Sequence, residues 1–264
     1  MNTCTSILCF SLLWPAAASF AQVLAPNDAG VAMGHLHLNV KDAEANKNFW
    51  IAMGATPAKL DDADIMKFPG VLIQLRQQQP TGGSVGSVVD HISFQVPNIQ
   101  ASLAQWKAAG IRIEPGSGTA QCYVFSPDDL KIEILENKSL TVPIATHHIH
   151  FMVIESSATE MQAWYVKMFG AKPGMKGTNQ TADVPGYSMS FGKSANAPLP
   201  SRGRVVDHVG FEVKNLEAFS KKLEANGVKL DTSYRKSRHP GLAIVELTDP
   251  WGTFIELTEG LPRL

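Results

Sequence analysis

The feature that most constrains the fold is a short strand pattern that occurs four times, each time with a histidine at the same position. Residues 206–213 read VDHVGFEV and residues 89–96 read VDHISFQV. Both alternate apolar and polar residues with the period of two that is typical of a β-strand with one buried face. The same alternation returns in residues 34–40 and 147–153. The histidines in register are His35, His91, His148 and His208. Four of them in one register indicate four copies of one structural unit.

Each copy opens a segment that is predicted to contain a helix followed by three further strands. The first helix is expected at residues 42–53, with Asp42 as its N-cap and Gly54 at its C-terminal end. The other three helices are expected at residues 98–109, 158–169 and 215–226, with Asn98 and Asn215 as N-caps of the second and fourth. The chain is therefore predicted to consist of four βαβββ units.

The length of the chain, 264 residues, is compatible with one or two domains. We expect an α+β protein with two domains, residues 33–137 and 145–260, each made of two consecutive units. Each half is predicted to close on itself as a cupped mixed sheet, with the two sheets in tandem and the helices on their outer faces. The apolar strand residues expected to face the helices are Leu36, Leu38, Ile92, Phe94, Val209 and Phe211.

The first 21 residues have the features of a secretory signal peptide. The apolar run from Ile7 to Ala18 is too short to span a bilayer, and Ser19 to Ala21 fits a small-x-small cleavage site before Gln22. An uncleaved anchor is the alternative. Cleavage would export the protein and leave Cys122 as its only cysteine. Internal disulfides and cysteine-based metal sites would then be excluded.

The charge of the chain gives no indication of a polyanionic partner. The formal net charge is −1, so nothing favours binding to nucleic acid or to an anionic membrane surface. The basic tracts at residues 202–204 and 234–238 are short, and we interpret them as solvated loops, with contact to an anionic substrate as the alternative. The expected partner is a small-molecule substrate, without nucleic acid and without a membrane after signal cleavage.

The last strand of each half places a glutamate between apolar neighbours, Glu133 in the first half and Glu256 in the second. Two histidines and a carboxylate suit a divalent metal ion such as Fe, Mn, Zn or Ni, and they leave coordination positions for a substrate. In Gln74 the first half has a further oxygen donor, and Ser190 stands at the equivalent position of the second half. The predicted ligands are His35, Gln74, His91 and Glu133 in the first half, and His148, His208 and Glu256 in the second.

These features together resemble the vicinal oxygen chelate superfamily, which includes glyoxalase, bleomycin-resistance and extradiol dioxygenase proteins. The resemblance covers residues 33–260. Besides the histidine strands it rests on residues 164–170 (WYVKMFG) and 249–256 (DPWGTFIE), with a weaker copy of the latter at 126–133. It implies paired βαβββ units that form a cupped sheet around one divalent metal. The metal would chelate two oxygens of a substrate and activate them as a Lewis acid.

Within this superfamily two enzyme classes and one class of binding protein compete. Residues 239–256 resemble the extradiol dioxygenase signature, and this resemblance favours a dioxygenase at His148, His208 and Glu256. Glu246 stands where the signature has a tyrosine. The other set, His35, Gln74, His91 and Glu133, resembles the metal sites of glyoxalase-like lyases and isomerases. The third alternative is a protein that sequesters a ligand without turnover, as bleomycin-resistance proteins do.

We expect the second half to hold the more reactive site, because three protein ligands leave up to three positions of an octahedral ion open. His239 precedes the ligand strand and could act as a base near neutral pH. His150 and Glu246 are the other candidate catalytic residues. The alternative is that Ser190 marks a degenerate site and that the first half is the intact one.

Overall fold

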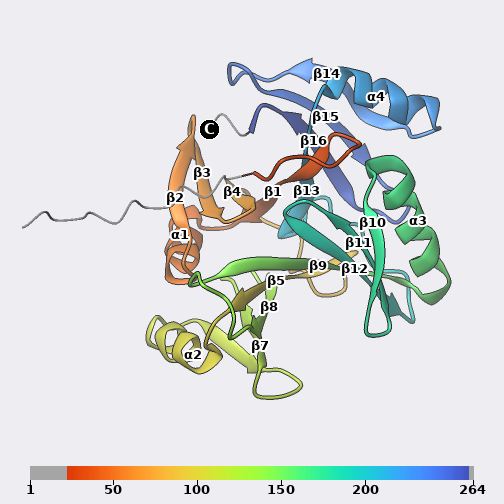
Figure 1. The fold of residues 1–264 in the computed structure, drawn as a ribbon. Coiled ribbons are helices and arrows are strands. Elements are labelled where there is room, and N and C mark those ends of the chain that lie inside the picture. Colours follow the sequence, from red (N-terminus) through yellow and green to blue (C-terminus); the bar gives the residue numbers. More distant parts are fainter. Residues whose placement is uncertain (1–22, 262–264) are drawn as a thin grey trace, which may run out of the picture.

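A computed structural model describes residues 23–261 of the chain, so the predicted signal peptide lies outside the described residues. Residues 23–261 form two mixed sheets of eight strands each, with four α-helices outside them (Figure 1). None of the helices in the described range is long and apolar enough to cross a membrane.

Sheet A combines the first and the fourth unit, in the strand order β14-β15-β16-β13-β1-β4-β3-β2. The first unit consists of β1 (Val31–Val40), α1 (Ala43–Ala52), β2 (Thr56–Leu60), β3 (Ala63–Phe68) and β4 (Val71–Gln77). The fourth unit consists of β13 (Val206–Val213), α4 (Leu216–Ala225), β14 (Leu230–Lys236), β15 (Ala243–Thr248) and β16 (Phe254–Glu259).

Sheet B combines the second and the third unit, in the strand order β10-β11-β12-β9-β5-β8-β7-β6. The second unit consists of β5 (Val89–Val96), α2 (Ile99–Ala108), β6 (Arg112–Pro115), β7 (Gln121–Phe125) and β8 (Lys131–Glu136). The third unit consists of β9 (Ala145–Ile154), a 3-10 turn (Glu155–Ser157), α3 (Ala158–Phe169), β10 (Lys172–Lys176), β11 (Asn179–Val184) and β12 (Tyr187–Ser194).

The prediction that each half of the chain closes on itself is wrong. The first strand β1 pairs antiparallel with β13 of the other half, and His37 lies opposite His208. In the same way β5 pairs with β9, and His91 lies opposite His150. The four histidine strands have nearly the same alternation, so their local pattern is compatible with any pairing among them.

The predicted assignment of strand faces is confirmed. All six apolar residues expected to face the helices are buried in one hydrophobic cluster that extends across both sheets. In this cluster Trp50 of α1 contacts Phe94 of sheet B at a ring-centroid distance of 6.4 Å. Phe169 of α3 contacts Phe211 of sheet A at 4.9 Å. Helices α1 and α3 therefore each connect their own sheet to the other one, while the histidines occupy the opposite, polar faces.

Two of the three predicted helix caps are confirmed, whereas the N-terminus of α4 is capped by a residue other than the predicted one. Asp42 and Asn98 accept hydrogen bonds from backbone N–H groups in the first turn of α1 and α2. Asn215 has a positive φ of 57° and makes no capping bond with its side chain. Instead, the carboxylate of Glu259 accepts from the backbone N–H of Leu216 at 3.0 Å. An anion at this end also interacts favourably with the helix dipole.

The crossed pairing of units gives a direct test of the topology. Fragments 23–141 and 142–261, produced separately, each lack the antiparallel partner of their central strands, so we expect neither to give the near-ultraviolet circular dichroism of the intact chain. Mixing the refolded fragments is expected to restore this spectrum and to give a one-to-one complex in size-exclusion chromatography. A native-like spectrum from either fragment as a monomer would contradict the observed pairing.

Candidate metal centres

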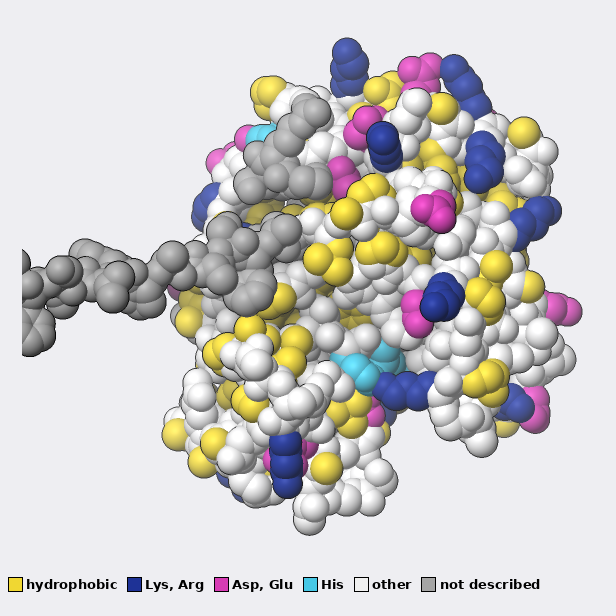
Figure 2. All heavy atoms as spheres, in the orientation of Figure 1, with side chains coloured by type: hydrophobic (Ala, Val, Ile, Leu, Met, Phe, Trp, Pro, Cys, Tyr) yellow, Lys and Arg dark blue, Asp and Glu magenta, His cyan; other side chains and the backbone are white. Residues whose placement is uncertain are grey.

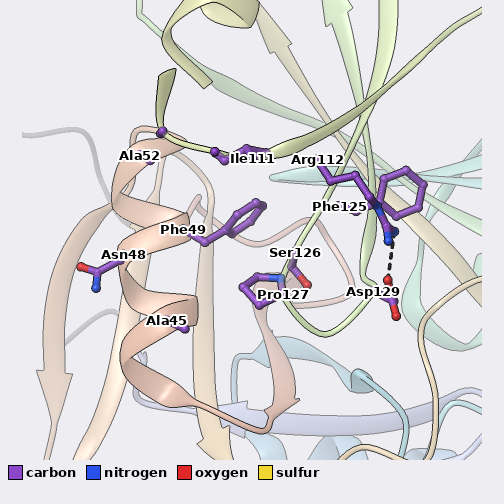
Figure 3. Close-up of a pocket in the computed structure, with 12 residues that line it drawn as sticks. Ala45, Asn48, Phe49, Ala52, Ile111, Arg112, Phe125, Ser126, Pro127 and Asp129 are labelled. Carbon is purple, nitrogen blue, oxygen red and sulfur yellow. Dashed lines mark ion pairs between the residues drawn. The ribbon is translucent and has the colours of Figure 1, made fainter. Parts of the chain in front are cut away.

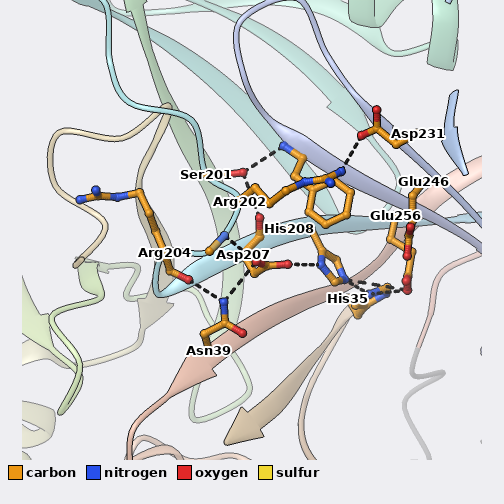
Figure 4. A network of polar contacts seen from close by, with 12 residues as sticks. His35, Asn39, Ser201, Arg202, Arg204, Asp207, His208, Asp231, Glu246 and Glu256 are labelled. Carbon is orange, nitrogen blue, oxygen red and sulfur yellow. Dashed lines mark hydrogen bonds and ion pairs between the residues drawn. The ribbon is translucent and has the colours of Figure 1, made fainter. Parts of the chain in front are cut away.

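The first candidate centre, site A, lies on the polar face of sheet A and joins three neighbouring strands. His35 comes from β1, His208 from β13 and Glu256 from β16. The Nε2 atom of His35 is 3.2 Å from the Nε2 atom of His208 and 3.2 Å from Oε1 of Glu256. The distance from His208 Nε2 to the same oxygen is 3.9 Å. Three potential ligand atoms therefore converge on one point (Figure 4).

A glycine on the neighbouring strand makes this convergence possible. Gly210 is paired with His35 across β1 and β13, and with Glu256 across β13 and β16. A Cβ atom at Gly210 would lie 2.1 Å from Nδ1 of His35. Because this position has no side chain, the imidazole can extend across β13 and reach the glutamate on the following strand.

A carboxylate behind the site fixes the orientation of His208. Nδ1 of His208 lies 2.9 Å from Oδ2 of Asp207, and the other oxygen accepts from Gly203 N–H at 2.7 Å and from the Asn39 amide at 3.1 Å. Burial raises the pKa of Asp207, but the hydrogen bonds with His208 and Gly203 outweigh it and lower this pKa to about 2. The ionised Asp207 accepts a hydrogen bond from Nδ1–H of His208, which leaves the Nε2 lone pair directed into the site.

The remaining groups of site A also favour the state in which a metal is bound. Burial raises the pKa of Glu256, but the hydrogen bond and the charge of His35 lower it to about 2. Burial, followed by the nearby His208 and His35, lowers the pKa of His37 to about 3. Near neutral pH Glu256 is therefore ionised, the form that a carboxylate ligand of a metal has to take, and the neighbouring imidazole of His37 is uncharged.

Site A opens into a cavity of about 610 Å³ between β4 and the segment that connects β14 to β15. Gln74 lines this cavity and is paired with His37 across β1 and β4. Two cations also line it, Arg76 of β4 and Arg238 of the basic tract at 234–238, and no ion pair of either guanidinium is found within residues 23–261. Apolar side chains complete the wall, namely Leu60, Leu242, Ile244, Phe254 and Leu261.

Two of the three predicted catalytic residues line the same cavity. His239 is part of its wall, and its Nδ1 lies 3.2 Å from Oδ1 of Asp61. Glu246 is paired with Glu256 across β15 and β16. The Glu246 carboxylate accepts hydrogen bonds from Thr232 at 3.1 Å and from Arg235 at 3.0 Å. The third residue, His150, belongs to sheet B and lies outside this cavity.

The second candidate centre, site B, occupies the polar face of sheet B. His91 of β5 and His148 and His150 of β9 form one group of potential metal ligands, and Glu133 of β8 lies beside it. Oε2 of Glu133 is 3.5 Å from Nε2 of His148 and 4.0 Å from Nε2 of His91. Asp90 contacts Nδ1 of His91 at 2.8 Å, as Asp207 contacts His208. In Figure 2, histidine side chains are visible in a recess of the surface beside a lysine or arginine.

The predicted residues are therefore brought together, but the grouping by halves is wrong. His35 and Gln74 of the first half join His208 and Glu256 of the second in site A, whereas His91 and Glu133 join His148 in site B. This follows from the pairing of the first unit with the fourth and of the second with the third. Whether these residues bind metal remains a prediction.

Sequence reasoning missed the two aspartates that support the histidines. Asp90 and Asp207 immediately precede His91 and His208, and each contacts Nδ1 of the histidine that follows it. The signal was present in the Val-Asp-His triplet that opens both strands, but alternation alone assigns the aspartate to the opposite face of the strand.

Another cavity, of about 520 Å³, is lined by α1, by the start of β6 and by residues between β7 and β8 (Figure 3). Phe49 of α1 and Phe125 of β7 are part of its wall, together with Arg112 and Asp129. Arg112 and Asp129 form an ion pair at 2.9 Å. The one carboxylate in this wall is thus already paired, so the cavity offers no set of metal ligands.

Comparison with solved structures identifies the fold. The chain superimposes on glyoxalase I from Zea mays with a TM-score of 0.66, at 13% sequence identity, covering 88% of this chain and 94% of that one. A putative dioxygenase from Bacillus subtilis gives a TM-score of 0.64 at 15% identity, covering 87% and 86% of the two chains. No protein-family model and no curated protein matches the sequence. The predicted vicinal oxygen chelate fold is thereby confirmed.

The requirement for glycine at position 210 can be tested by one substitution. In Gly210→Ala the new methyl group would overlap the His35 ring, so we expect a loss of about 1–3 kcal/mol in the free energy of unfolding, as for other overpacked sites. The matched control is Gly118→Ala, where a Cβ meets nothing within 4 Å and the change is expected to stay below about 1 kcal/mol. Chemical denaturation measures both, and equal stabilities would contradict the close approach.

Proposed function

We propose that the protein is a metal-dependent enzyme that acts at site A on a small organic molecule with adjacent oxygens. The observation that supports this most directly is the convergence of His35 Nε2, His208 Nε2 and Glu256 Oε1 within 3.2–3.9 Å on the wall of a cavity of about 610 Å³. Two imidazoles and a carboxylate are a set that binds Fe, Mn, Zn or Ni.

The donor set of site A fits a cation. Because Asp207 accepts a hydrogen bond from Nδ1–H of His208, the Nε2 atom of His208 presents a lone pair to the site. The carboxylate of Glu256 is ionised and directed at the same point. A divalent ion held there would supply Lewis acidity to two adjacent oxygens of a substrate.

Among the reactions open to such a site, we favour a glyoxalase-like lyase or isomerase. Gln74 lines the cavity and adds a neutral oxygen donor to the two histidines and the glutamate. Glu246 stands beside Glu256 on the adjacent strand, where it can accept a substrate proton. Thr232 and Arg235 hold the carboxylate of Glu246 in place. An extradiol dioxygenase is the second candidate, because His35, His208 and Glu256 alone form a two-histidine, one-carboxylate triad with open positions.

The cavity also suggests the charge of the substrate. Arg76 and Arg238 both line it without an ion-pair partner in the described range, and they can bind a carboxylate or a similar anion. Asp61 and Asp62 line the same opening, and Asp61 is in contact with His239. A substrate with one anionic group and two adjacent oxygens fits these walls.

Paired substitutions separate site A from site B. His208→Ala removes a ligand of site A, and we expect it to abolish turnover in assays with hemithioacetals of 2-oxoaldehydes, and with catechols while oxygen uptake is recorded. The matched variant His91→Ala changes the equivalent histidine of site B and is expected to retain turnover. Loss of activity in His91→Ala alone would contradict the assignment, and bound ligand without turnover in the wild type would indicate a sequestering protein.

The anion contact leads to a separate kinetic prediction. Arg238→Gln is expected to raise KM about tenfold or more for an anionic substrate, since a charge-assisted hydrogen bond contributes about 1.5–3 kcal/mol. A neutral ester of the same substrate should show no such difference between wild type and variant. Equal KM changes for the acid and the ester would mean that Arg238 does not contact the anion.

We also propose that the protein is exported and processed before Gln22. The support is the apolar run followed by small residues at positions 19 and 21 of the sequence. N-terminal sequencing of the protein from an extracytoplasmic fraction should begin at Gln22. Intact Met1 on soluble cytoplasmic protein would overturn this proposal.

A further inference from the structure

Sites A and B occupy equivalent positions in their sheets, but their ligand sets differ at one strand. Gly70 and Gly186 both precede the strand that lies parallel to the histidine strand, so Gln74 corresponds to Ser190. The register confirms this equivalence, because His37 is paired with Gln74 in sheet A and His150 with Ser190 in sheet B. Site B thus lacks the amide donor of site A.

The strands β4 and β12 also differ at a second position, and this difference affects where the neighbouring histidine side chain lies. Arg76 of β4 corresponds to Gly192 of β12. A Cβ atom at Gly192 would lie 2.2 Å from Nε2 of His150, so the imidazole of His150 occupies space that any other residue at this position would fill. In site A the equivalent His37 lies against His208 at a centroid distance of 4.4 Å, and it is not part of the converging ligand group.

The room at Gly192 brings His150 into the ligand group of site B. The imidazole of His150 stacks on His91 with a centroid distance of 4.5 Å and an interplanar angle of 14°. Potential ligand nitrogens of His91, His148 and His150 all lie within 4.8 Å of one another. Nδ1 of His91 contacts Asp90 and Nδ1 of His148 contacts His147 at 2.7 Å, so both rings have Nε2 available.

Glu133 supplies an independent indication of a cation-binding position. The residue is only 7% exposed, and its Oε2 atom is buried without a hydrogen-bond partner. The other oxygen, Oε1, accepts a hydrogen bond from Gln121. A buried carboxylate oxygen that points between His91 and His148 without a donor is costly unless a cation is bound there.

We propose that site B is a closed, four-coordinate zinc site formed by His91, His148, His150 and Glu133, distinct from the catalytic centre at site A. Three imidazole nitrogens and one carboxylate oxygen would fill all four positions of tetrahedral zinc, the geometry of structural zinc sites, and leave no position for a substrate. His91 and Glu133 belong to the first half of the chain, and His148 and His150 to the second. The ion therefore links the two halves across the β5–β9 pair.

Cobalt substitution distinguishes the two kinds of site, because Co²⁺ absorbs visible light far more strongly in four-coordinate than in six-coordinate sites. We expect EDTA-treated protein to bind two equivalents of Co²⁺, one of them with intense absorption, and Zn²⁺ to displace the intense signal. His150→Ala should lose this signal and bind Zn²⁺ at site B about tenfold or more weakly, while the matched control His37→Ala keeps it. A wild type without the intense signal, or a His150→Ala variant that retains it, would overturn the proposal.

Two further variants separate this result from misfolding and from the function of site A. Gly192→Ala leaves all four ligands in the sequence but displaces the His150 ring, so it should also lose the intense signal, with metal-free circular dichroism like that of the wild type. His208→Ala disrupts site A only and should keep the signal even if turnover is lost. An intense signal that persists in Gly192→Ala, or one that disappears in His208→Ala, would contradict the assignment of the signal to site B.

Discussion

The antiparallel pairing of histidine strands from opposite halves of the chain is the constraint on which the rest of the structure depends. Pairing of β1 with β13 brings the ring of His35 over Gly210 and toward Glu256. Pairing of β5 with β9 places His91 opposite His150 in sheet B. Because the apolar residues of these strands alternate with the histidines, the same pairings place the shared hydrophobic core behind both sites. Stability and candidate chemistry therefore rest on one set of hydrogen-bonded ladders.

The two sites show how small differences in sequence alter a repeated scaffold. Both keep a histidine that contacts an aspartate, and both have a glutamate from the last strand of a unit beside the histidines. In sheet A the neighbouring strand carries Gln74 and Arg76, which line an open cavity. In sheet B the equivalent positions hold a serine and Gly192, and the space is filled by an additional imidazole. The open site suits turnover, and the more crowded one suits retention of an ion.

The sequence alone predicted the fold class, the strand faces and the ligand types, because alternation and the register of the histidines are local properties. It could not predict which strands pair, since the four histidine strands are too similar to select a partner. For the same reason the importance of Gly210 and Gly192 became visible only once the register was known. The role of Glu259 at the start of α4 was hidden in a similar way, because the carboxylate reaches the helix only through the pairing of β13 with β16.

The nested order of the units also determines when each sheet can be completed as the chain emerges from the ribosome. All strands of sheet B lie between residues 89 and 194, whereas sheet A needs both β1 and the strand that ends at Glu259. Since translation proceeds from the N-terminus, sheet B can assemble before β13, the partner strand of β1, has been synthesised. The first unit is thus synthesised first, but its sheet is completed among the last. For most of synthesis β1 is an unpaired edge strand that can pair with a wrong strand.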